Sequence, residues 1–189
     1  MQVGHCKSCI DLIEQKGKYC IRGIIDRPEK RYETVLSYEI IGCDEDIETL
    51  SKSYKYFFIS IGYLSINSLR KDLFTKVRSF GLYCTIIVSP YAYVSKHAFI
   101  DQGTIIMHNV TINAGVRIGK NCIINTSSII EHDVLIDYNT HVAPGAVING
   151  GTKIEEGSFI GSNSVCRHNI NIGRNSFVKF HSRIKSSIN

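Results

Sequence analysis

The spacing of hydrophobic residues changes about halfway along the chain. From Tyr93 onward, every sixth residue counted from Val94 is apolar as far as Ile184, and all sixteen members of this series are Val, Ile or Cys. At a background of 43% hydrophobic residues, that outcome has a probability on the order of one in a million for one chosen phase. A second series, four residues later in each hexad, is almost entirely small or β-branched. This half of the chain is therefore a repeat structure.

A six-residue period of this kind predicts a triangular prism of parallel strands, with three hexads in each turn. One aliphatic residue from each hexad fills the interior, and one small residue fits the corner. Sixteen hexads correspond to about five coils. Because no insertion interrupts the count, we expect no protruding loop.

The first half of the chain alternates between helical and extended patterns. Apolar spacing and end signals predict helices at 7–15, 44–53 and 66–80, and strands at 19–26, 38–41, 56–61 and 82–88. Strands that alternate with helices favour a parallel sheet. We therefore expect two domains, residues 1–90 and residues 91–189.

Composition excludes several classes of protein. A net charge of +5 is too small to indicate a nucleic-acid partner, and no run approaches the ~20 apolar residues that span a bilayer. The chain has seven cysteines, an odd number, and its N-terminus does not have the apolar segment of a cleavable signal peptide. Both observations favour reduced thiols in a soluble, cytoplasmic protein over a disulfide framework. Cys6 and Cys9 have CxxC spacing but no second ligand pair, so we expect no metal site.

One phrase in the repeats is specific. Residues 125–133 are Asn-Thr-Ser-Ser-Ile-Ile-Glu-His-Asp, and Gly4-His5, residues 23–26 and residues 59–62 accompany it. With the hexads, these motifs make nearly the whole chain similar to the hexapeptide-repeat acyltransferases. Within them it resembles the family of sialic acid O-acetyltransferases and UDP-4-amino-sugar N-acetyltransferases. The resemblance implies a Rossmann-like sugar-nucleotide-binding domain followed by a left-handed parallel β-helix.

The resemblance also implies direct transfer of an acetyl group from acetyl-CoA to a sugar, between subunits of a homotrimer. His132 matches the family's general base, a role that suits a side chain that titrates near neutral pH. Asp133 matches a carboxylate that stabilises the imidazolium. The family mostly has Glu at that position, so we expect the shorter Asp to contact the ring less well. Glu131 is the alternative partner.

Three residues match family positions that contact acetyl-CoA: His141, Ser162 and Phe180. Phe180 stands where the family often has glycine. From Gly157 onward the chain holds five basic residues and no acidic one, Arg167, Arg174, Lys179, Arg183 and Lys185. This cationic end suits either the coenzyme phosphates or a solvated surface. We interpret the other prism histidines His108, His168 and His181 as surface or stacking residues.

The acceptor site is expected on the N-terminal domain. The family binds a nucleotide there through a Gly-rich loop after its first strand and an acid at the end of its second. Gly4, His5 and Asp26 match these positions, and Gly62 lines the third turn. A glycine allows close approach of a phosphate, and an acid can accept a ribose hydroxyl. The family's opening strand is missing from this chain, which indicates a truncated start or a weakened nucleotide site.

These observations favour N-acetylation of an amino sugar, with a UDP-4-amino-sugar as the expected acceptor, in bacterial surface-glycan synthesis. Two alternatives stay open. One is O-acetylation of sialic acid or a related nonulosonate, since an amine and a hydroxyl both need a base. The other is a non-catalytic partner of a sugar synthase.

Overall fold

The computed structural model describes residues 3–62 and 69–188. These residues form two compact units. The first contains residues 3–62 and 69–85, and the second contains residues 86–188.

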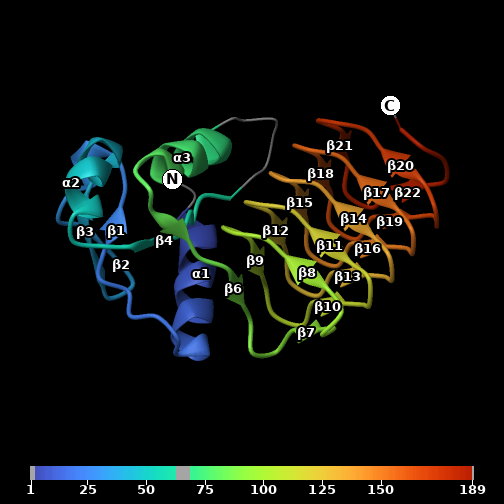
Figure 1. Cartoon of the computed structure of the whole chain (residues 1–189), viewed down its shortest axis with the longest axis horizontal. Helices are drawn as coiled ribbons and strands as arrows, with labels where there is room; N and C mark the ends of the chain where they lie inside the picture. Colours follow the sequence, from blue (N-terminus) through green and yellow to red (C-terminus); the bar gives the residue numbers. More distant parts are fainter. Residues whose placement is uncertain (1–2, 63–68, 189) are drawn as a thin grey trace. The chain divides into compact units, whose positions relative to one another are not determined.

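The second unit is a parallel β-helix of two-residue strands that stack coil upon coil (Figure 1). We name its three parallel sheets faces I, II and III. Face I consists of β6 (Ile87–Val88), β9 (Ile105–Ile106), β12 (Ile123–Ile124), β15 (His141–Val142), β18 (Phe159–Ile160) and β21 (Phe177–Val178). Face II consists of β7 (Tyr93–Val94), β10 (Thr111–Ile112), β13 (Ile129–Ile130), β16 (Val147–Ile148), β19 (Val165–Cys166) and β22 (Arg183–Ile184). Face III consists of β8 (Phe99–Ile100), β11 (Arg117–Ile118), β14 (Leu135–Ile136), β17 (Lys153–Ile154) and β20 (Asn171–Ile172).

Every strand pairs in register with the strand 18 residues away. Ile123 lies opposite His141, for example, and His141 lies opposite Phe159. The second residue of each strand belongs to the apolar hexad series and fills the interior, where Ile112 and Ile130 have no exposed surface. The structure thus confirms the prism, with five coils and two further strands.

Four-residue turns join the faces, and we call these corners vertex I/II, vertex II/III and vertex III/I. Most of the small hydroxyl residues expected at the corners are buried, and several of their hydroxyls donate to carbonyls of the next coil. Thr104 donates to Gly119 at 2.8 Å, and Ser158 donates to Gly173 at 2.9 Å. Most turns place one residue at positive φ, usually Asn or Gly. Asn and Gly tolerate this left-handed conformation better than other residues.

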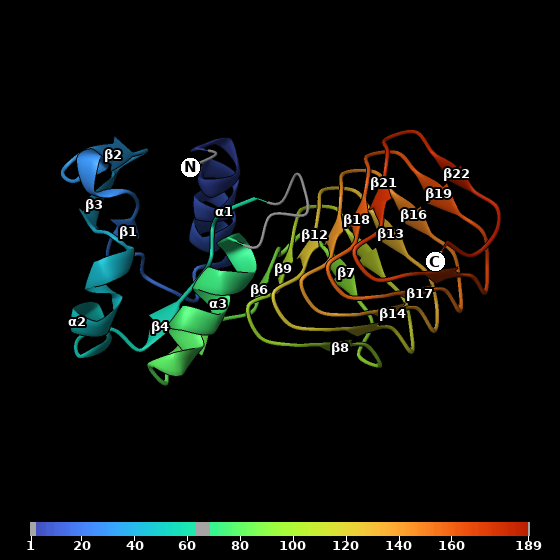
Figure 2. The same ribbon diagram turned by 90° about the horizontal axis from the view of Figure 1, so that it is seen from above.

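The first unit contains three helices and two small sheets (Figure 2). Its helices are α1 (Val3–Lys16), α2 (Ile47–Ser51) and α3 (Leu69–Ser79), with 3-10 turns at Pro28–Lys30 and Asp44–Asp46. One sheet has the order β1 (Ile24–Ile25), β3 (Tyr38–Gly42), β2 (Thr34–Val35), and the other pairs β4 (Tyr56–Phe57) with β5 (Tyr83–Cys84). Among the described residues no strand joins the two sheets.

Several strands of the first unit are shorter than the sequence predicted. The expected strand 82–88 is divided: Tyr83–Cys84 pairs with β4, whereas Ile87–Val88 pairs with β9 of the prism. Val88 lies six residues before Val94, so the hexad series begins one step earlier than expected and the prism starts before residue 90. The expected strand 19–26 is reduced to two residues. Of the expected helix 66–80, residues 66–68 lie outside the described residues.

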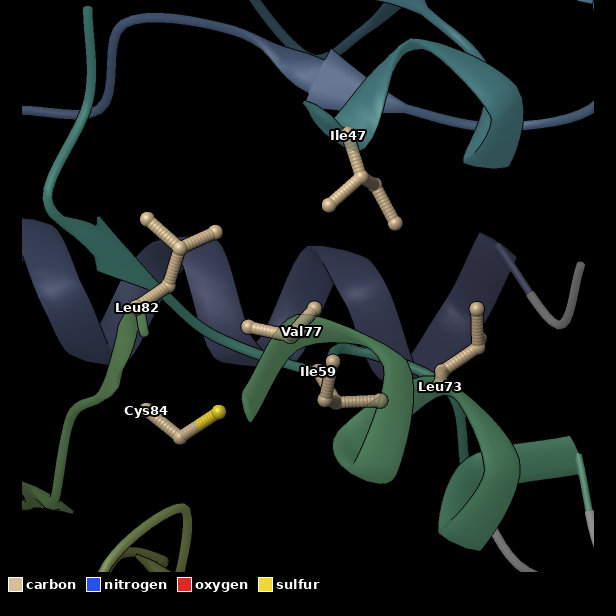
Figure 3. Packing of buried hydrophobic residues seen from close by; sticks show 6 residues of the cluster. All are labelled: Ile47, Ile59, Leu73, Val77, Leu82 and Cys84. Atoms are coloured by element: carbon tan, nitrogen blue, oxygen red, sulfur yellow. The ribbon is translucent and has the colours of Figure 1, made fainter. Parts of the chain in front are cut away.

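Two apolar clusters hold the first unit together. One packs α3 against the strand ends through Ile47, Ile59, Leu73, Val77, Leu82 and Cys84 (Figure 3). The other packs α1 against the three-stranded sheet through Cys6, Ile10, Ile24, Val35 and Ile40.

All seven cysteines are free thiols. No described helix is both long and apolar enough to cross a bilayer. Nor do the described residues contain a group of three or more potential metal ligands.

The two residues of β14 provide a matched test of which side chains point into the interior of the prism. Ile136 is 3% exposed, whereas its neighbour Leu135 is 42% exposed. Ile136→Ala should lower the free energy of unfolding by about 2–5 kcal/mol, because it leaves a cavity in the prism. Leu135→Ala should cost less than about 1 kcal/mol. Urea unfolding of both variants checks this, and equal losses would contradict the assigned direction of the side chains.

Candidate active site

His132 and Asp133 lie together at vertex II/III, in the turn between β13 and β14. The carboxylate oxygen Oδ2 of Asp133 is 2.9 Å from Nδ1 of His132. Both side chains are exposed, at 62% and 72% respectively. When Nδ1–H donates to this carboxylate, Nε2 carries the free lone pair. The pair can therefore accept a proton at Nε2 and stabilise the imidazolium that results.

Asp133 reaches the ring because of its backbone conformation. It has a φ of 59°, and it occupies the turn position that other coils fill with Asn or Gly at positive φ. Asp tolerates this conformation better than most residues. Gly115, one coil below, has no Cβ that would collide with the carboxylate. The shorter acid therefore makes the contact that the sequence led us to doubt.

Glu131 is not the partner of the imidazole. Its Oε2 accepts a hydrogen bond of 2.9 Å from the side-chain amide of Asn113, the residue 18 positions earlier. Of the two acids beside His132, only Asp133 contacts the ring among the interactions that the structure describes.

Gly150 provides the space for the imidazole. It lies one coil above His132, and a Cβ at this position would be 2.6 Å from Nε2 of His132. Real Cβ atoms do not approach so closely, so any side chain here would move the ring. Nothing in the hexad code distinguished this glycine from the others. It could have been found only by stacking the sequence at the 18-residue register.

His141 lies on face I and is 5% exposed. The side-chain amide of Asn125 is 3.2 Å from its Nε2, and Phe159 packs edge-on against its ring, with centroids 5.2 Å apart. Asn125 is the first residue of the motif at residues 125–133, but the sequence analysis did not predict its contact with His141. The 18-residue spacing of the coils could have predicted this contact, because a residue on vertex I/II lies beside the end of the strand one coil above.

Ser162 and Phe180 lie on vertex I/II at equivalent positions of successive coils, since they are 18 residues apart. The carbonyl of Ser162 accepts the amide of His181, which follows Phe180. Phe180 is 73% exposed. The three residues expected to contact acetyl-CoA therefore lie along face I and vertex I/II.

A single chain does not bring His132 and His141 together. In a triangular prism each vertex is opposite one face, and vertex II/III, which joins faces II and III, is opposite face I. His132 and His141 thus lie on opposite sides of the same prism. A site that uses both needs two copies of the chain.

The residues expected to bind the acceptor lie in the first unit. Gly4 and His5 form part of the first turn of α1, so the expected loop position is helical. Asp26 follows β1, and Gly62 ends the first described stretch. His5 Nε2 and Asp26 Oδ2 are buried and have no hydrogen-bond partner among the described residues. Two buried atoms with unmet polar capacity suit a polar ligand.

Arg70 of α3 is a further residue that the sequence did not indicate. It is buried, and its Nη1 donates to the carbonyls of Ile59 and Ile61, the second at 2.9 Å. It thereby fixes the turn that leads to Gly62. Burial first, and then the positive charge of Arg70, lower the pKa of His5 from 6.5 to about 4.

Several known proteins are similar to this chain. The PglD N-terminal domain family matches residues 2–77. The acetyltransferase domain of PglB from Neisseria gonorrhoeae FA1090 is 27% identical, covers 98% of this chain and 89% of its own, and has a TM-score of 0.91. A histidine-to-asparagine variant of perosamine N-acetyltransferase from Caulobacter crescentus, solved with CoA and GDP-perosamine, is 26% identical with a TM-score of 0.92, over 98% and 86% of the two chains.

Over nearly its whole length the chain is similar to hexapeptide-repeat acetyltransferases. WeeI from Acinetobacter baumannii AYE shares the fold of this acetyltransferase at 22% identity, with a TM-score of 0.85 over 96% of this chain and 87% of that one. The prism is accordingly a left-handed parallel β-helix.

Gly150→Ala should displace the imidazole of His132 in this acetyltransferase. Because a shift of about 1 Å at a reacting group can cost about 10²-fold in rate, we expect kcat to fall by that order while the unfolding midpoint changes little. Steady-state kinetics of acetyl transfer measure the effect. In a His132→Ala background the same substitution should cause no further loss. Equal losses in both backgrounds would contradict the assigned role.

His5 makes the stability of the first unit depend on pH. Its pKa is about 4 in the folded chain and 6.5 in the reference state, so the unfolded chain binds the proton more readily between these values. Stability should therefore decline as pH falls from 6.5 to 4, by about 3 kcal/mol at most. His5→Gln should remove this decline, and replacing the exposed His97 by Gln should leave it in place. Urea unfolding at several pH values provides the measurement.

Proposed function

We propose that the chain transfers the acetyl group of acetyl-CoA to the amine of a nucleotide-linked amino sugar, with His132 as the general base. The observation that carries the proposal is the contact between His132 Nδ1 and Asp133, at 2.9 Å, which leaves Nε2 to accept a proton. The matched Caulobacter protein is an N-acetyltransferase solved with CoA and GDP-perosamine, and a matched Neisseria domain was solved with acetyl coenzyme A.

The chemistry follows from this geometry. The sugar nitrogen attacks the carbonyl carbon of the thioester, and the carbon–sulfur bond breaks to release CoA as a thiolate. His132 Nε2 takes the proton that the nitrogen loses, and Asp133 stabilises the imidazolium. The same proton can then pass to the thiolate. A positioned base of this kind contributes ~10² to 10⁴ in rate.

The donor is proposed to lie along face I and vertex I/II. His141, held by Asn125, would contact acetyl-CoA near the reacting group, and Ser162 and Phe180 would contact it in later coils. These contacts run from the coil of the catalytic pair toward the C-terminal end of the prism.

The acceptor nucleotide is proposed to bind the first unit. Gly4 and His5 lie at the N-terminus of α1, where backbone N–H groups favour a phosphate. Asp26 Oδ2, buried without a partner among the described residues, can accept a ribose hydroxyl. Gly62 would line the same site. A UDP-linked 4-amino sugar is our proposed acceptor, and a GDP-linked one is the alternative that the Caulobacter protein raises.

A homotrimer would complete the active site. The outward residues of face II are mostly apolar or uncharged: Tyr93 and Val165 are 61% and 41% exposed, and Thr111, Ile129 and Val147 are partly buried. Face II lies between vertex I/II and vertex II/III. Three copies that bury this face around a common axis would place His141 of each copy beside His132 of the partner subunit.

Seven free thiols favour the cytoplasm as the location.

An acceptor panel with a matched histidine control tests the function. The purified chain is incubated with labelled acetyl-CoA and UDP-amino sugars, GDP-amino sugars or sialic-acid-like nonulosonates. His132→Ala should lower kcat ~10² to 10⁴-fold. His168→Ala, at the same vertex position two coils later, should leave kcat unchanged.

Each other outcome has a defined meaning. Transfer that survives in His132→Ala would overturn the general-base assignment. Product formed only on a hydroxyl would replace the amine by an O-acetylation function. Binding of acetyl-CoA without transfer to any acceptor would favour a non-catalytic partner of a sugar synthase.

A further inference from the structure

The first unit carries a group of exposed cations interspersed with aromatic side chains. Three segments contribute to it, residues 16–22, 52–56 and 78–83, and we call them together the basic aromatic surface. These segments hold six of the 22 Lys and Arg residues of the chain and none of its 17 Asp and Glu residues. All six cationic side chains are exposed: Lys16, Lys18, Arg22, Lys52, Lys55 and Arg78. The net charge of +5 is therefore concentrated here, and the rest of the chain is close to neutral.

Direct contacts join the three segments. The rings of Tyr19 and Tyr56 have centroids 5.8 Å apart, and the rings of Tyr56 and Tyr83 have centroids 6.0 Å apart. The backbone N–H of Tyr83 also donates to the carbonyl of Lys55 at 3.0 Å. Each of these contacts crosses from one segment to the next, so the cations that flank the tyrosines belong to one continuous surface.

The cations of this surface are not neutralised by acids of the same chain. Within residues 3–62 and 69–188, every ion pair that the structure shows involves another cation. Glu14, the acid that precedes residues 16–22, accepts a hydrogen bond of 2.8 Å from the hydroxyl of Tyr38. Uncompensated charge of one sign attracts a partner of the opposite sign.

The packing of the tyrosines favours a bilayer over a nucleic acid as that partner. A base stacks on an open ring face, but Tyr56 packs between Tyr19 and Tyr83, and the ammonium of Lys18 lies 5.3 Å from the ring centroid of Tyr19. Tyr56 and Tyr83 are nevertheless 61% and 57% exposed. An exposed tyrosine with an apolar ring and a polar hydroxyl suits the headgroup layer of a membrane.

Phe80 adds an apolar side chain to this surface. It follows the end of α3, in a turn that Gly81 closes with a φ of 72°. Phe80 is 37% exposed and lies in the same segment as Arg78 and Tyr83. A phenylalanine in this setting can enter the boundary between headgroups and acyl chains while its cationic neighbours stay with the phosphates.

We propose that the basic aromatic surface binds the chain peripherally to bilayers that contain anionic phospholipids. Its lysines and arginines contact the lipid phosphates, its tyrosines lie at the level of the headgroups, and Phe80 enters the boundary below them. Clusters of about 4–8 Lys and Arg residues attract anionic bilayers in this way. The inference does not depend on the proposed acetyl transfer.

Vesicle sedimentation tests the proposal on the full chain. The chain should bind vesicles of equal parts phosphatidylcholine and phosphatidylglycerol but not vesicles of phosphatidylcholine alone, and added salt should weaken the binding by screening. Lys18→Gln combined with Lys55→Gln should lower the partition coefficient about 25-fold, because each cation contributes about fivefold. Lys7→Gln combined with Lys120→Gln removes the same charge outside the surface and should leave the coefficient unchanged.

Fluorescence tests the insertion of Phe80. The chain contains no tryptophan, so a single introduced tryptophan reports only its own surroundings. The emission of Phe80→Trp should shift to shorter wavelengths when anionic vesicles are added. Phe99→Trp, at a position on face III that is 54% exposed, should show no shift.

Several results would overturn the proposal. These are equal binding to both kinds of vesicle, equal effects of the two double variants, and a shift for Phe80→Trp no larger than that for Phe99→Trp. Binding of a single-stranded oligonucleotide through Lys18 and Lys55, without binding to vesicles, would assign the surface to nucleic acid instead. A change of oligomeric state in the Lys18 and Lys55 double variant, again without vesicle binding, would assign it to a second copy of the chain.

Discussion

Parallel stacking of coils at an 18-residue spacing constrains every other feature of the second unit. Each strand pairs with the strands 18 residues before and after it, so Ile123, His141 and Phe159 occupy the same place in successive coils. The inward aliphatic residues fix this register, because a slip of one residue would turn them all toward solvent. Position in the chain therefore determines which face or vertex each side chain occupies.

The chemistry of the site depends on this register in two ways. At vertex II/III the turn requires a residue that tolerates positive φ, and Asp133 meets that requirement while its carboxylate reaches the imidazole. The same register places His132 opposite the face that carries His141. The prism thus holds each half of the proposed site rigidly but keeps the halves apart, which makes assembly of several copies part of the proposed mechanism.

Much of the fold follows from the sequence because the hexad period reports directly on burial. The first unit was less predictable. An apolar run such as 82–88 does not show where its hydrogen-bond partners change, and in the structure Cys84 and Ile87 pair with strands of different units. Within the site, His132 was indicated by its phrase. The contact of Asp133 with the imidazole depends on the backbone φ of Asp133. The roles of Asn125 and Gly150 depend on contacts between coils. The spacing of residues along the sequence reveals neither.

Mixed trimers test most directly whether the site is shared between copies. His132→Ala and His141→Ala chains, carrying different tags, are co-expressed and purified through both tags in succession. If one copy supplies His132 and the next supplies His141, each variant alone should be severely impaired. Each mixed trimer that carries both tags should restore one of its three sites, about a third. Activity of the mixture that does not exceed that of the separate variants would contradict a shared site.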